Sequence, residues 1–290
     1  MNINTELSIV IPAYNEEKGI EKVLEELKKV LDKIKKPYEI IVVDDGSTDN
    51  TAKIVKEKKD VILFQHPINK GYGAALKTGI KKANGEYILI IDADGTYPNK
   101  EIPKLLEHID QYDMIVGART GENVNIQLYR KPAKLFLTKL ANYLVGTKIP
   151  DLNSGMRIFR KKDVEKYVHI LPSGFSFTTT ITLAYLSNDY LVKYVPIDYH
   201  ERHGKSKIKP FKDGFNFILL IVRTITYFNP LKVFLPISFV LFLVSVIIFL
   251  VSWLVFKKVM DITVIVLLVA SIQIALFGLI ADSIAKKGGI

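Results

Sequence analysis

Short apolar runs alternate with mixed stretches of polar and apolar residues along positions 1–231. The apolar runs are rich in β-branched residues and predict strands at 7–11, 39–43, 61–65, 87–91 and 113–117. The stretches between them predict helices at 17–33, 47–58, 73–83 and 100–109. This alternation is typical of an α/β fold in which helices flank a mostly parallel sheet.

The C-terminal part of the chain contains two long stretches without a charged residue. Residues 233–256 and 262–281 are 24 and 20 residues long. A helix needs about 20 residues to cross a bilayer core of ~30 Å, and core helices rarely run this far without a charge. Because only five residues separate the stretches, we expect a two-helix transmembrane hairpin rather than a pair of buried core helices. Residues 232–290 would then anchor an integral, multi-pass protein in the cell membrane.

The stretch before the first span is apolar but not uncharged. Residues 211–229 include Lys212, Asp213 and Arg223. A third span would bury Arg223 at a cost of roughly 3 kcal/mol, so we expect an amphipathic helix in the membrane interface over 211–231. Residues 131–145 suit either a second helix of this kind or a plain core helix. Residues 1–210 then form the globular domain.

The distribution of charge predicts on which side of the membrane that domain lies. The chain has a formal net charge of +10, and lysines crowd both flanks of the hairpin, at 205–212 and at 286–287. Basic flanks predict a cytoplasmic domain and an attraction to anionic lipid, although Lys257 and Lys258 in the hairpin turn favour the opposite orientation. We see no basic helix with interleaved aromatic residues, so nucleic acid is not an expected partner. The absence of cysteine excludes disulfides and thiolate chemistry.

Acidic residues follow the predicted strand at 87–91. In sheets of this kind ligands bind beyond the carboxyl ends of the strands. Asp92 and Asp94 lie two residues apart at such an end, and paired carboxylates there can hold Mg²⁺ or Mn²⁺ while leaving positions for phosphate. The alternative is a simple capping turn before Pro98.

Two further loops have the composition of a nucleotide site. Asp44 and Asp45 follow the strand at 39–43, where a carboxylate can accept hydrogen bonds from a nucleobase or from ribose hydroxyls; a capped strand-to-helix turn is the alternative. Gly71-Tyr72-Gly73 begins like a dinucleotide fingerprint but lacks the third glycine. We expect Gly71 to let a helix N-terminus approach the nucleotide.

The arginines of this lysine-rich chain form a separate signal. There are six arginines against 34 lysines, and four of them lie in motif-like surroundings: Arg119, Arg130, Arg157 and Arg202. Arginine binds phosphate with a planar fork that lysine cannot reproduce. We therefore interpret several of them as phosphate ligands, with surface salt bridges as the alternative.

Taken together, these motifs resemble the family 2 glycosyltransferases of the GT-A (Rossmann-like) fold. The resemblance rests on the segments 12–16 (Pro-Ala-Tyr-Asn-Glu), 43–49 (Val-Asp-Asp-Gly-Ser-Thr-Asp), 92–94 (Asp-Ala-Asp) and 116–119 (Val-Gly-Ala-Arg). The segments 151–157 and 202–207 are similar to motifs of the branch that contains dolichyl-phosphate mannose synthase and polyprenyl-phosphate glucosyltransferases. The resemblance covers residues 7–210 almost continuously.

The resemblance implies a role for each matching residue. The nucleotide sugar would be held by Pro12, Tyr14, Glu16, Asp44, Asp45, Gly71, Asp92, Ala93, Asp94 and Arg202. The phosphate of the lipid acceptor would be bound by Arg119, Arg130, Ser154, Ser206 and Lys207. The catalytic residues would be Asp94, Arg119, Arg130, Asp151 and Arg157, and the metal ligands Asp92 and Asp94.

The activity implied is that of a membrane-bound inverting glycosyltransferase, which moves a hexose from GDP-mannose or a UDP-hexose to dolichyl or polyprenyl phosphate. Two departures matter. Gly95-Thr96 stands where many relatives have Leu-Gln, whose Gln helps the metal, and residues 175–180 lack a carboxylate where a Glu often appears. The third metal ligand and the sugar therefore stay open.

Other functions compete with this one. A processive polysaccharide synthase would carry a Q-x-x-R-W motif, but the single tryptophan, Trp253, lies in the first span. A glycosyltransferase for another lipid or glycan acceptor, and a non-catalytic membrane partner that binds nucleotide sugars, stay as alternatives. A homo-oligomer is compatible with all of them.

Overall fold

The computed structural model of the chain describes residues 5–121, 131–174, 176–200, 210–257 and 261–287. Within these residues, seven strands form one sheet in the order β3-β2-β1-β4-β6-β5-β7. The strands are β1 (Leu7–Ala13), β2 (Tyr38–Asp44), β3 (Val61–Gln65), β4 (Tyr87–Ile90), β5 (Met114–Ala118), β6 (Arg157–Arg160) and β7 (Val192–Pro196). The five predicted strands are all present, which confirms the strand pattern read from the sequence.

The sheet is mixed but mostly parallel. β1 pairs in parallel with β2 and β4, β2 with β3, and β5 with β7, whereas β6 runs antiparallel to both of its neighbours, β4 and β5. The register sets Ala13 opposite Asp44 and Val10 opposite Ile90. The carboxyl ends of β1, β2 and β4 therefore meet at one edge of the sheet, and β5 ends at the same edge.

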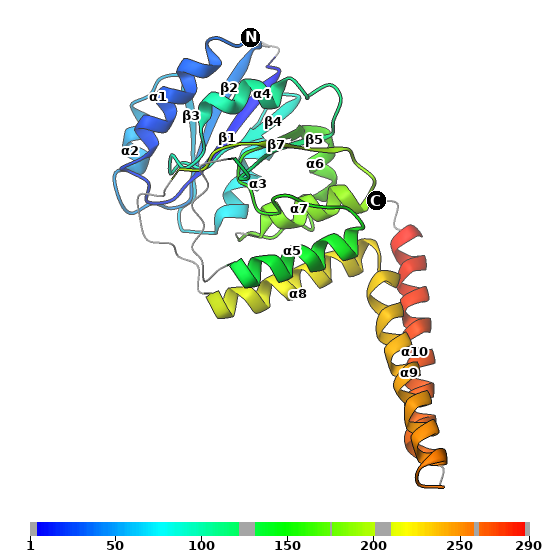
Figure 1. The fold of residues 1–290 in the computed structure, drawn as a ribbon. Coiled ribbons are helices and arrows are strands. Elements are labelled where there is room, and N and C mark those ends of the chain that lie inside the picture. The colour runs from blue at the N-terminus through cyan, green and yellow to red at the C-terminus, as the bar shows by residue number, and fades with distance from the viewer. Residues whose placement is uncertain (1–4, 122–130, 175, 201–209, 258–260, 288–290) are drawn as a thin grey trace.

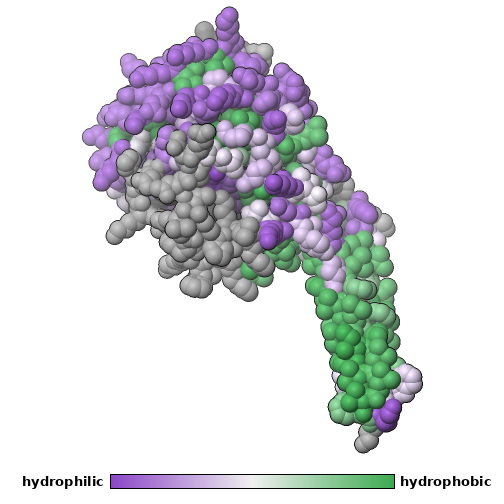
Figure 2. Space-filling model, viewed as in Figure 1, coloured by the Kyte–Doolittle hydropathy of each residue, from purple (hydrophilic) through white to green (hydrophobic). Residues whose placement is uncertain are grey.

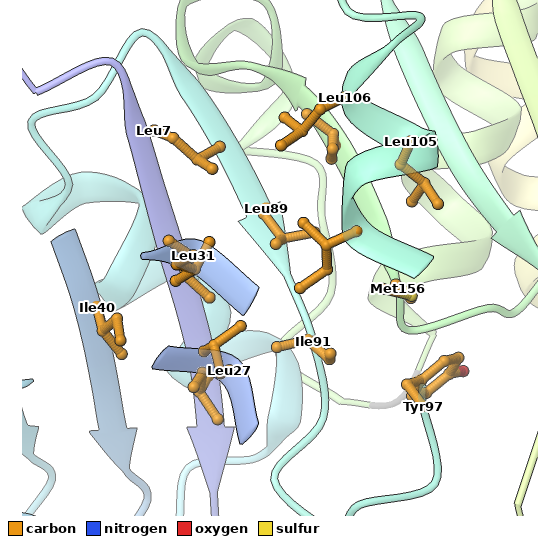
Figure 3. Close-up of a cluster of buried hydrophobic side chains, with 14 of the residues drawn as sticks. Leu7, Leu27, Leu31, Ile40, Leu89, Ile91, Tyr97, Leu105, Leu106 and Met156 are labelled. Carbon is orange, nitrogen blue, oxygen red and sulfur yellow. The ribbon is translucent and has the colours of Figure 1, made fainter. Parts of the chain in front are cut away.

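Helices cover both faces of the sheet (Figure 1). One face packs against α1 (Ile20–Leu31), α2 (Thr51–Lys56) and α4 (Ile102–Leu106, after a 3₁₀ turn at Asn99–Glu101). Figure 3 shows this core, in which Leu27 and Leu31 of α1 lie over the sheet close to Leu89. The other face packs against α3 (Tyr72–Lys82), α6 (Lys161–Tyr167) and α7 (Phe177–Ser187). Alternate residues of β1 enter the two cores, as expected for a strand buried on both faces.

Two further helices form a layer beyond α7. In Figure 1, α5 (Lys131–Val145) and α8 (Pro210–Phe228) lie side by side across the lower side of the domain. Ala141 and Leu144 of α5 pack in one cluster with Ile221 and Ile225 of α8. Arg223 lies on the exposed side of α8. The C-terminal half of each helix therefore buries one face against the domain.

The chain ends in the helical hairpin α9 (Leu231–Leu254) and α10 (Asp261–Lys287). It projects away from the domain (Figure 1), and its surface is hydrophobic where that of the domain is mostly polar (Figure 2). Only 6% and 11% of the most apolar windows of the two helices are buried, which excludes a pair of core helices. Ser238 Oγ donates a hydrogen bond across the hairpin to the carbonyl of Ser271 at 2.7 Å, and Ser245 Oγ to that of Val264 at 3.0 Å. Both helices are long and apolar enough to cross a membrane.

Candidate active site

The loops after β1 and β2 are locked together by hydrogen bonds. Asn15 has a positive φ of 55°; its amide donates a hydrogen bond to Ser47 Oγ (2.9 Å), and its Oδ1 accepts one from the amide of Thr48 (2.8 Å). The amide of Glu16 is bonded to Thr51 Oγ1 at 2.9 Å. The hydroxyls of Ser47 and Thr51 thus both accept hydrogen bonds from backbone N–H groups. The two loops form one rigid wall at the carboxyl edge of the sheet.

The predicted nucleotide residues lie along this wall. Pro12 is buried within β1, and Tyr14 is half-buried directly after the strand. Asp44 is only 2% exposed. Its carboxylate accepts bonds from the amide of Ser47 (3.2 Å) and from Gln65 Nε2 (3.3 Å). The carboxylate is thus oriented by two neutral donors at the end of β2.

Asp45 has different surroundings. It is 2% exposed, and its Oδ1 lies 2.6 Å from His66 Nδ1 and 3.0 Å from the amide of Lys70. Its Oδ2 accepts a bond from the amide of Gly71 at 2.7 Å. Gly71 has a φ of 102°, and a Cβ there would lie 2.5 Å from the carbonyl oxygen of Ser173. Asp45 therefore fixes the loop that leads into α3, where only glycine fits.

Asp92 and Asp94 follow β4 and are both half-buried. Asp92 Oδ1 accepts a hydrogen bond from the hydroxyl of Tyr72 at 2.8 Å, and burial keeps the pKa of Tyr72 well above its usual value, so the hydroxyl stays a donor. Asp94 Oδ1 accepts bonds from Thr96, at 3.1 Å from its amide and 2.7 Å from its Oγ1. Gly155 lies against Asp92, because a Cβ at Gly155 would be only 2.6 Å from Oδ2. Both carboxylates are thus held in place by neighbouring groups.

The oxygen donors of Asp92 and Asp94 fit a hard divalent cation. Between them, Ala93 is buried at 2% exposure and spaces the two carboxylates. Among the residues that the structure describes, no group of three or more acidic or histidine side chains could hold a metal ion. Asp92 and Asp94 would be protein ligands to such a cation.

A second charged centre lies at the end of β5. Arg119 donates two parallel hydrogen bonds to Asp151, from Nε at 2.7 Å and from Nη2 at 2.9 Å, and the amide of Arg119 adds a third at 3.0 Å. The guanidinium also lies over the ring of Tyr199, 5.2 Å from its centroid. Burial alone would lower the pKa of Arg119, but nearby Tyr97 and the bonds to Asp151 raise it well above its usual value. This is a fixed, permanently charged guanidinium.

The turn at 151–155 connects the two centres. Ser154 is fully buried, and its Oγ donates to the carbonyl oxygen of Gly117 at 2.5 Å. The amide of Gly155 is bonded to the hydroxyl oxygen of Tyr97 at 2.6 Å. The turn therefore begins with Asp151, which binds Arg119, and ends with Gly155, which lies against Asp92. Ser154 Oγ is enclosed in the protein interior.

Arg157 is also placed behind the turn. It is fully buried, and its guanidinium donates to the carbonyl oxygens of Ser154 and Thr178 and to Thr182 Oγ1. Burial lowers its pKa, against the opposing effect of nearby tyrosines and Asp151. The four other predicted residues, Arg130, Arg202, Ser206 and Lys207, lie outside the described residues.

Several residues of the site were not predicted from the sequence. The hydroxyl of Tyr72 donates a hydrogen bond to Asp92, and the hydroxyl of Tyr97 accepts one from the amide of Gly155. The ring of Tyr199 lies against the guanidinium of Arg119. His66 bridges Asp45 and Thr78 Oγ1, at 2.6 and 2.9 Å. Nothing in the local sequence distinguishes these side chains from ordinary core residues. Only their positions in space assign them to the site.

A comparison with protein families decides which family carries this arrangement. The model of glycosyl transferase family 2 matches residues 8–168, more than half of the chain. The chain belongs to glycosyl transferase family 2. The GtrB C-terminal hairpin matches residues 229–286, the segment of α9 and α10. These matches confirm the predicted family, the enzyme class and the C-terminal hairpin, and they identify this glycosyltransferase as a membrane protein.

Relatives of this glycosyltransferase include a hexosyltransferase of glycan biosynthesis and a dolichyl-phosphate hexose transferase. The low-salt glycan biosynthesis hexosyltransferase Agl6 of Haloferax volcanii is 33% identical over 218 residues, which cover 73% of this chain and 52% of that protein. The dolichyl-phosphate hexose transferase of the same organism is 30% identical over 211 residues, covering 72% and 89%. The chain thus spans about half the length of the first relative and most of the second.

Solved structures share the fold of this glycosyltransferase. Glucosyl-3-phosphoglycerate synthase from Mycobacterium tuberculosis, in a complex with Mn²⁺, uridine diphosphate and phosphoglyceric acid, has a TM-score of 0.61. The sequence identity is 18%, over 76% of this chain and 78% of that one. The similarity at this identity concerns the fold alone, and it confirms the predicted α/β architecture with its mostly parallel sheet.

Proposed function

We propose that this glycosyltransferase moves a hexose from a nucleotide sugar to the phosphate of a dolichyl or polyprenyl lipid at the membrane surface. One observation carries the proposal. A single turn, 151–155, joins an oxygen-rich centre at Asp92 to a fixed guanidinium at Arg119. The first suits the diphosphate of a donor and the second the phosphate of an acceptor. The apolar hairpin and the names of the relatives, which act on dolichyl phosphate or make glycans, support a lipid acceptor.

The donor would lie along the wall formed by the loops after β1 and β2. Pro12, Tyr14, Glu16 and Asp44 would hold the nucleoside, with Asp44 as the hydrogen-bond acceptor. Asp45 would act indirectly, because its oxygens hold the loop that ends at Gly71. GDP-mannose and UDP-hexoses both fit this proposal.

Asp92 and Asp94 would hold Mg²⁺ or Mn²⁺ at the donor diphosphate. The solved Mn²⁺ and uridine diphosphate complex of a protein with the same fold supports a divalent cation here. When bound, such a cation would supply positive charge that stabilises the departing nucleoside diphosphate. The residues of the chain contribute the orientation of the two carboxylates, through the bonds from Tyr72 and Thr96.

The acceptor phosphate would meet Arg119. Asp151 accepts from Nε and Nη2, so it fixes the plane of the guanidinium and leaves the Nη1 side as the face toward a phosphate. The motif resemblance proposes Arg130, Ser206 and Lys207 as further acceptor ligands and Arg202 as a donor ligand. Ser154 would hold the turn instead of binding the lipid, since its hydroxyl is buried and donates to Gly117.

The reaction would need no strong protein base. A phosphate monoester with a second pKa of about 6 is largely dianionic at neutral pH and can itself act as the nucleophile. One of its oxygens would form the new bond to the anomeric carbon while the bond to the nucleoside diphosphate breaks. This single displacement inverts the anomeric centre and leaves a lipid-phosphate sugar and a nucleoside diphosphate.

The proposal is tested with the full chain in detergent, Mn²⁺ or Mg²⁺, polyprenyl phosphate and a panel of labelled sugar nucleotides. We expect label in the lipid phase with one donor, and none after chelation of the metal or in the Asp94→Asn variant. Label on the lipid that persists in EDTA would contradict the metal role. Binding of sugar nucleotides with no transfer to any prenyl phosphate would contradict the function and favour another acceptor or a non-catalytic partner.

A further inference from the structure

Arg157 is a buried cation whose described hydrogen bonds all go to uncharged groups. It is the largest fully buried side chain among the described residues. Burying an ion costs several kcal/mol, and apolar residues of similar size often replace buried charges without loss of stability. A chain that uses lysine for most of its cations has nevertheless placed an arginine here. The reason must lie in what the guanidinium contacts.

The guanidinium joins three elements that are distant in the sequence. Nε and Nη2 both donate to the carbonyl oxygen of Ser154, at 3.0 and 2.5 Å. Nη1 donates to the carbonyl oxygen of Thr178 at 3.1 Å and to Thr182 Oγ1 at 2.8 Å, both in α7, and lies 3.8 Å from Met114 Sδ of β5. Only a planar fork with several donors can make these contacts together, and an ammonium group cannot.

The contacts of Ser154 and Gly155 carry this constraint to both charged centres. The Oγ of Ser154 is bonded to the carbonyl of Gly117, two residues before Arg119. Gly155 lies against the carboxylate of Asp92 with no room for a Cβ. A displacement of the carbonyl of Ser154 would therefore change the spacing between Arg119 and Asp92.

We propose that Arg157 is a positioning residue, which clamps the 151–155 turn to α7 and so sets the spacing of the acceptor guanidinium and the donor carboxylate. The proposal rests on the proposed function, because that function assigns the two centres to the two substrates. In this proposal Arg157 contacts neither substrate. Loss of the clamp would leave each substrate able to bind and would misplace one relative to the other.

The test compares Arg157→Lys and Arg157→Met with Arg160→Lys and Arg160→Met in the full chain. Arg160 is a matched control, because it lies on the same strand but its side chain is 28% exposed. Its Nη1 lies 3.9 Å from Asp113 Oδ1, which makes a loose ion pair. Three quantities are measured: amide hydrogen exchange, binding of Mn²⁺ with UDP or GDP, and kcat for the lipid product. Thermal unfolding shows that each variant is folded.

We expect faster exchange of the amides of 151–156 and 177–182 in both Arg157 variants, by about 10- to 100-fold, because the hydrogen bonds of the planar guanidinium are lost. kcat should fall by up to about 100-fold, the cost of a displacement of roughly 1 Å, while nucleotide binding changes by less than about 3-fold. The Arg160 variants should match the wild type. A tenfold loss of nucleotide binding would overturn the proposal, since Arg157 would then be needed for donor binding itself. Unchanged exchange with unchanged kcat would also overturn it.

A milder variant keeps the test valid if Arg157→Met does not fold. Thr182→Val removes one acceptor of the clamp without changing the arginine, and it should shift exchange and kcat in the same direction by a smaller factor. Its effect should be non-additive with Arg157→Lys, because both act on one contact; full additivity would overturn the clamp. Exchange and nucleotide binding need no turnover. If the wild type makes no lipid product, the proposed function fails, and the clamp is judged by those two measurements.

Discussion

The contact between Gly155 and Asp92 gives a prediction with a magnitude that follows from distances. In Gly155→Ala, the added Cβ would lie 2.6 Å from Asp92 Oδ2 and 2.9 Å from Oδ1. Ordinary van der Waals contact begins at 3.4 Å, so the two groups must separate by about 0.8 Å. The turn is held at the amide of Gly155 by Tyr97. We therefore expect the carboxylate to move, and its bond from Tyr72 to lengthen.

Overpacking of this kind costs about 1–3 kcal/mol. If the whole of this cost opposes the cation-bound position of Asp92, the binding of Mn²⁺ with UDP or GDP should weaken about 5- to 150-fold. The binding is measured by titration of Mn²⁺ at a fixed nucleotide concentration, with the full chain in detergent. Thermal unfolding of the same samples reports how much of the cost appears as lost stability.

Two comparisons make this prediction specific. Gly174→Ala is the matched control, because a Cβ at Gly174 meets nothing within 4 Å, and it should bind the cation like the wild type. In the Asp92→Ala background the clash is removed, so Gly155→Ala should cost much less stability there than in the wild type. If Gly155→Ala binds Mn²⁺ and nucleotide with wild-type affinity and unfolds at the wild-type temperature, the role given to this contact is refuted.

The remaining predictions concern the other centres and the membrane. Arg119→Lys loses the paired bonds to Asp151 and should raise the KM for polyprenyl phosphate about tenfold with nucleotide binding unchanged; an unchanged acceptor KM would contradict the acceptor role. Tyr72→Phe removes one hydrogen bond from an uncharged donor to the carboxylate of Asp92 and should raise the Mn²⁺ concentration for half-activity by about 2- to 10-fold, whereas equal metal dependence would contradict it. In this cysteine-free chain, a thiol at Lys22→Cys should react with impermeant maleimide only after the cell membrane is opened, and one at Lys257→Cys before; the reverse pattern would contradict a cytoplasmic domain.

The sequence predicts most strongly where the physical signal is local. The short apolar runs within β1, β2 and β4 indicated strands of a mostly parallel sheet, and the structure confirms them. β6 has the sequence Arg-Ile-Phe-Arg, and its two arginines hide a four-residue strand among polar positions. Whether such a segment forms a strand depends on pairing with β4 and β5, which are far away in the sequence. Local propensity cannot supply that information.

The same limit applies to the polar residues of the site. Asp92 and Arg119 could be selected from the sequence because they end strands at the ligand edge of the sheet. Ser154 and Arg157 share one short motif with Asp151, so the family resemblance gave all of them a role at the substrates. All three are buried, and their partners separate them: Ser154 and Arg157 donate to backbone carbonyls, whereas Asp151 binds the guanidinium of Arg119. A polar motif that enters a strand presents some of its side chains to the core, and spacing does not say which.

The short link between domain and hairpin restricts how the active edge can face the membrane. α8 ends at Phe228 and α9 begins at Leu231, so only two residues separate the layer of α5 and α8 from the first apolar helix. In Figure 1 the parallel strands run toward the side of the domain where α5 and α8 lie. Their carboxyl ends, which carry Asp92 and Arg119, therefore point to the side from which the hairpin leaves. A lipid whose chain is in the bilayer can present its phosphate only near that surface, so this orientation favours a membrane-bound acceptor over a soluble one.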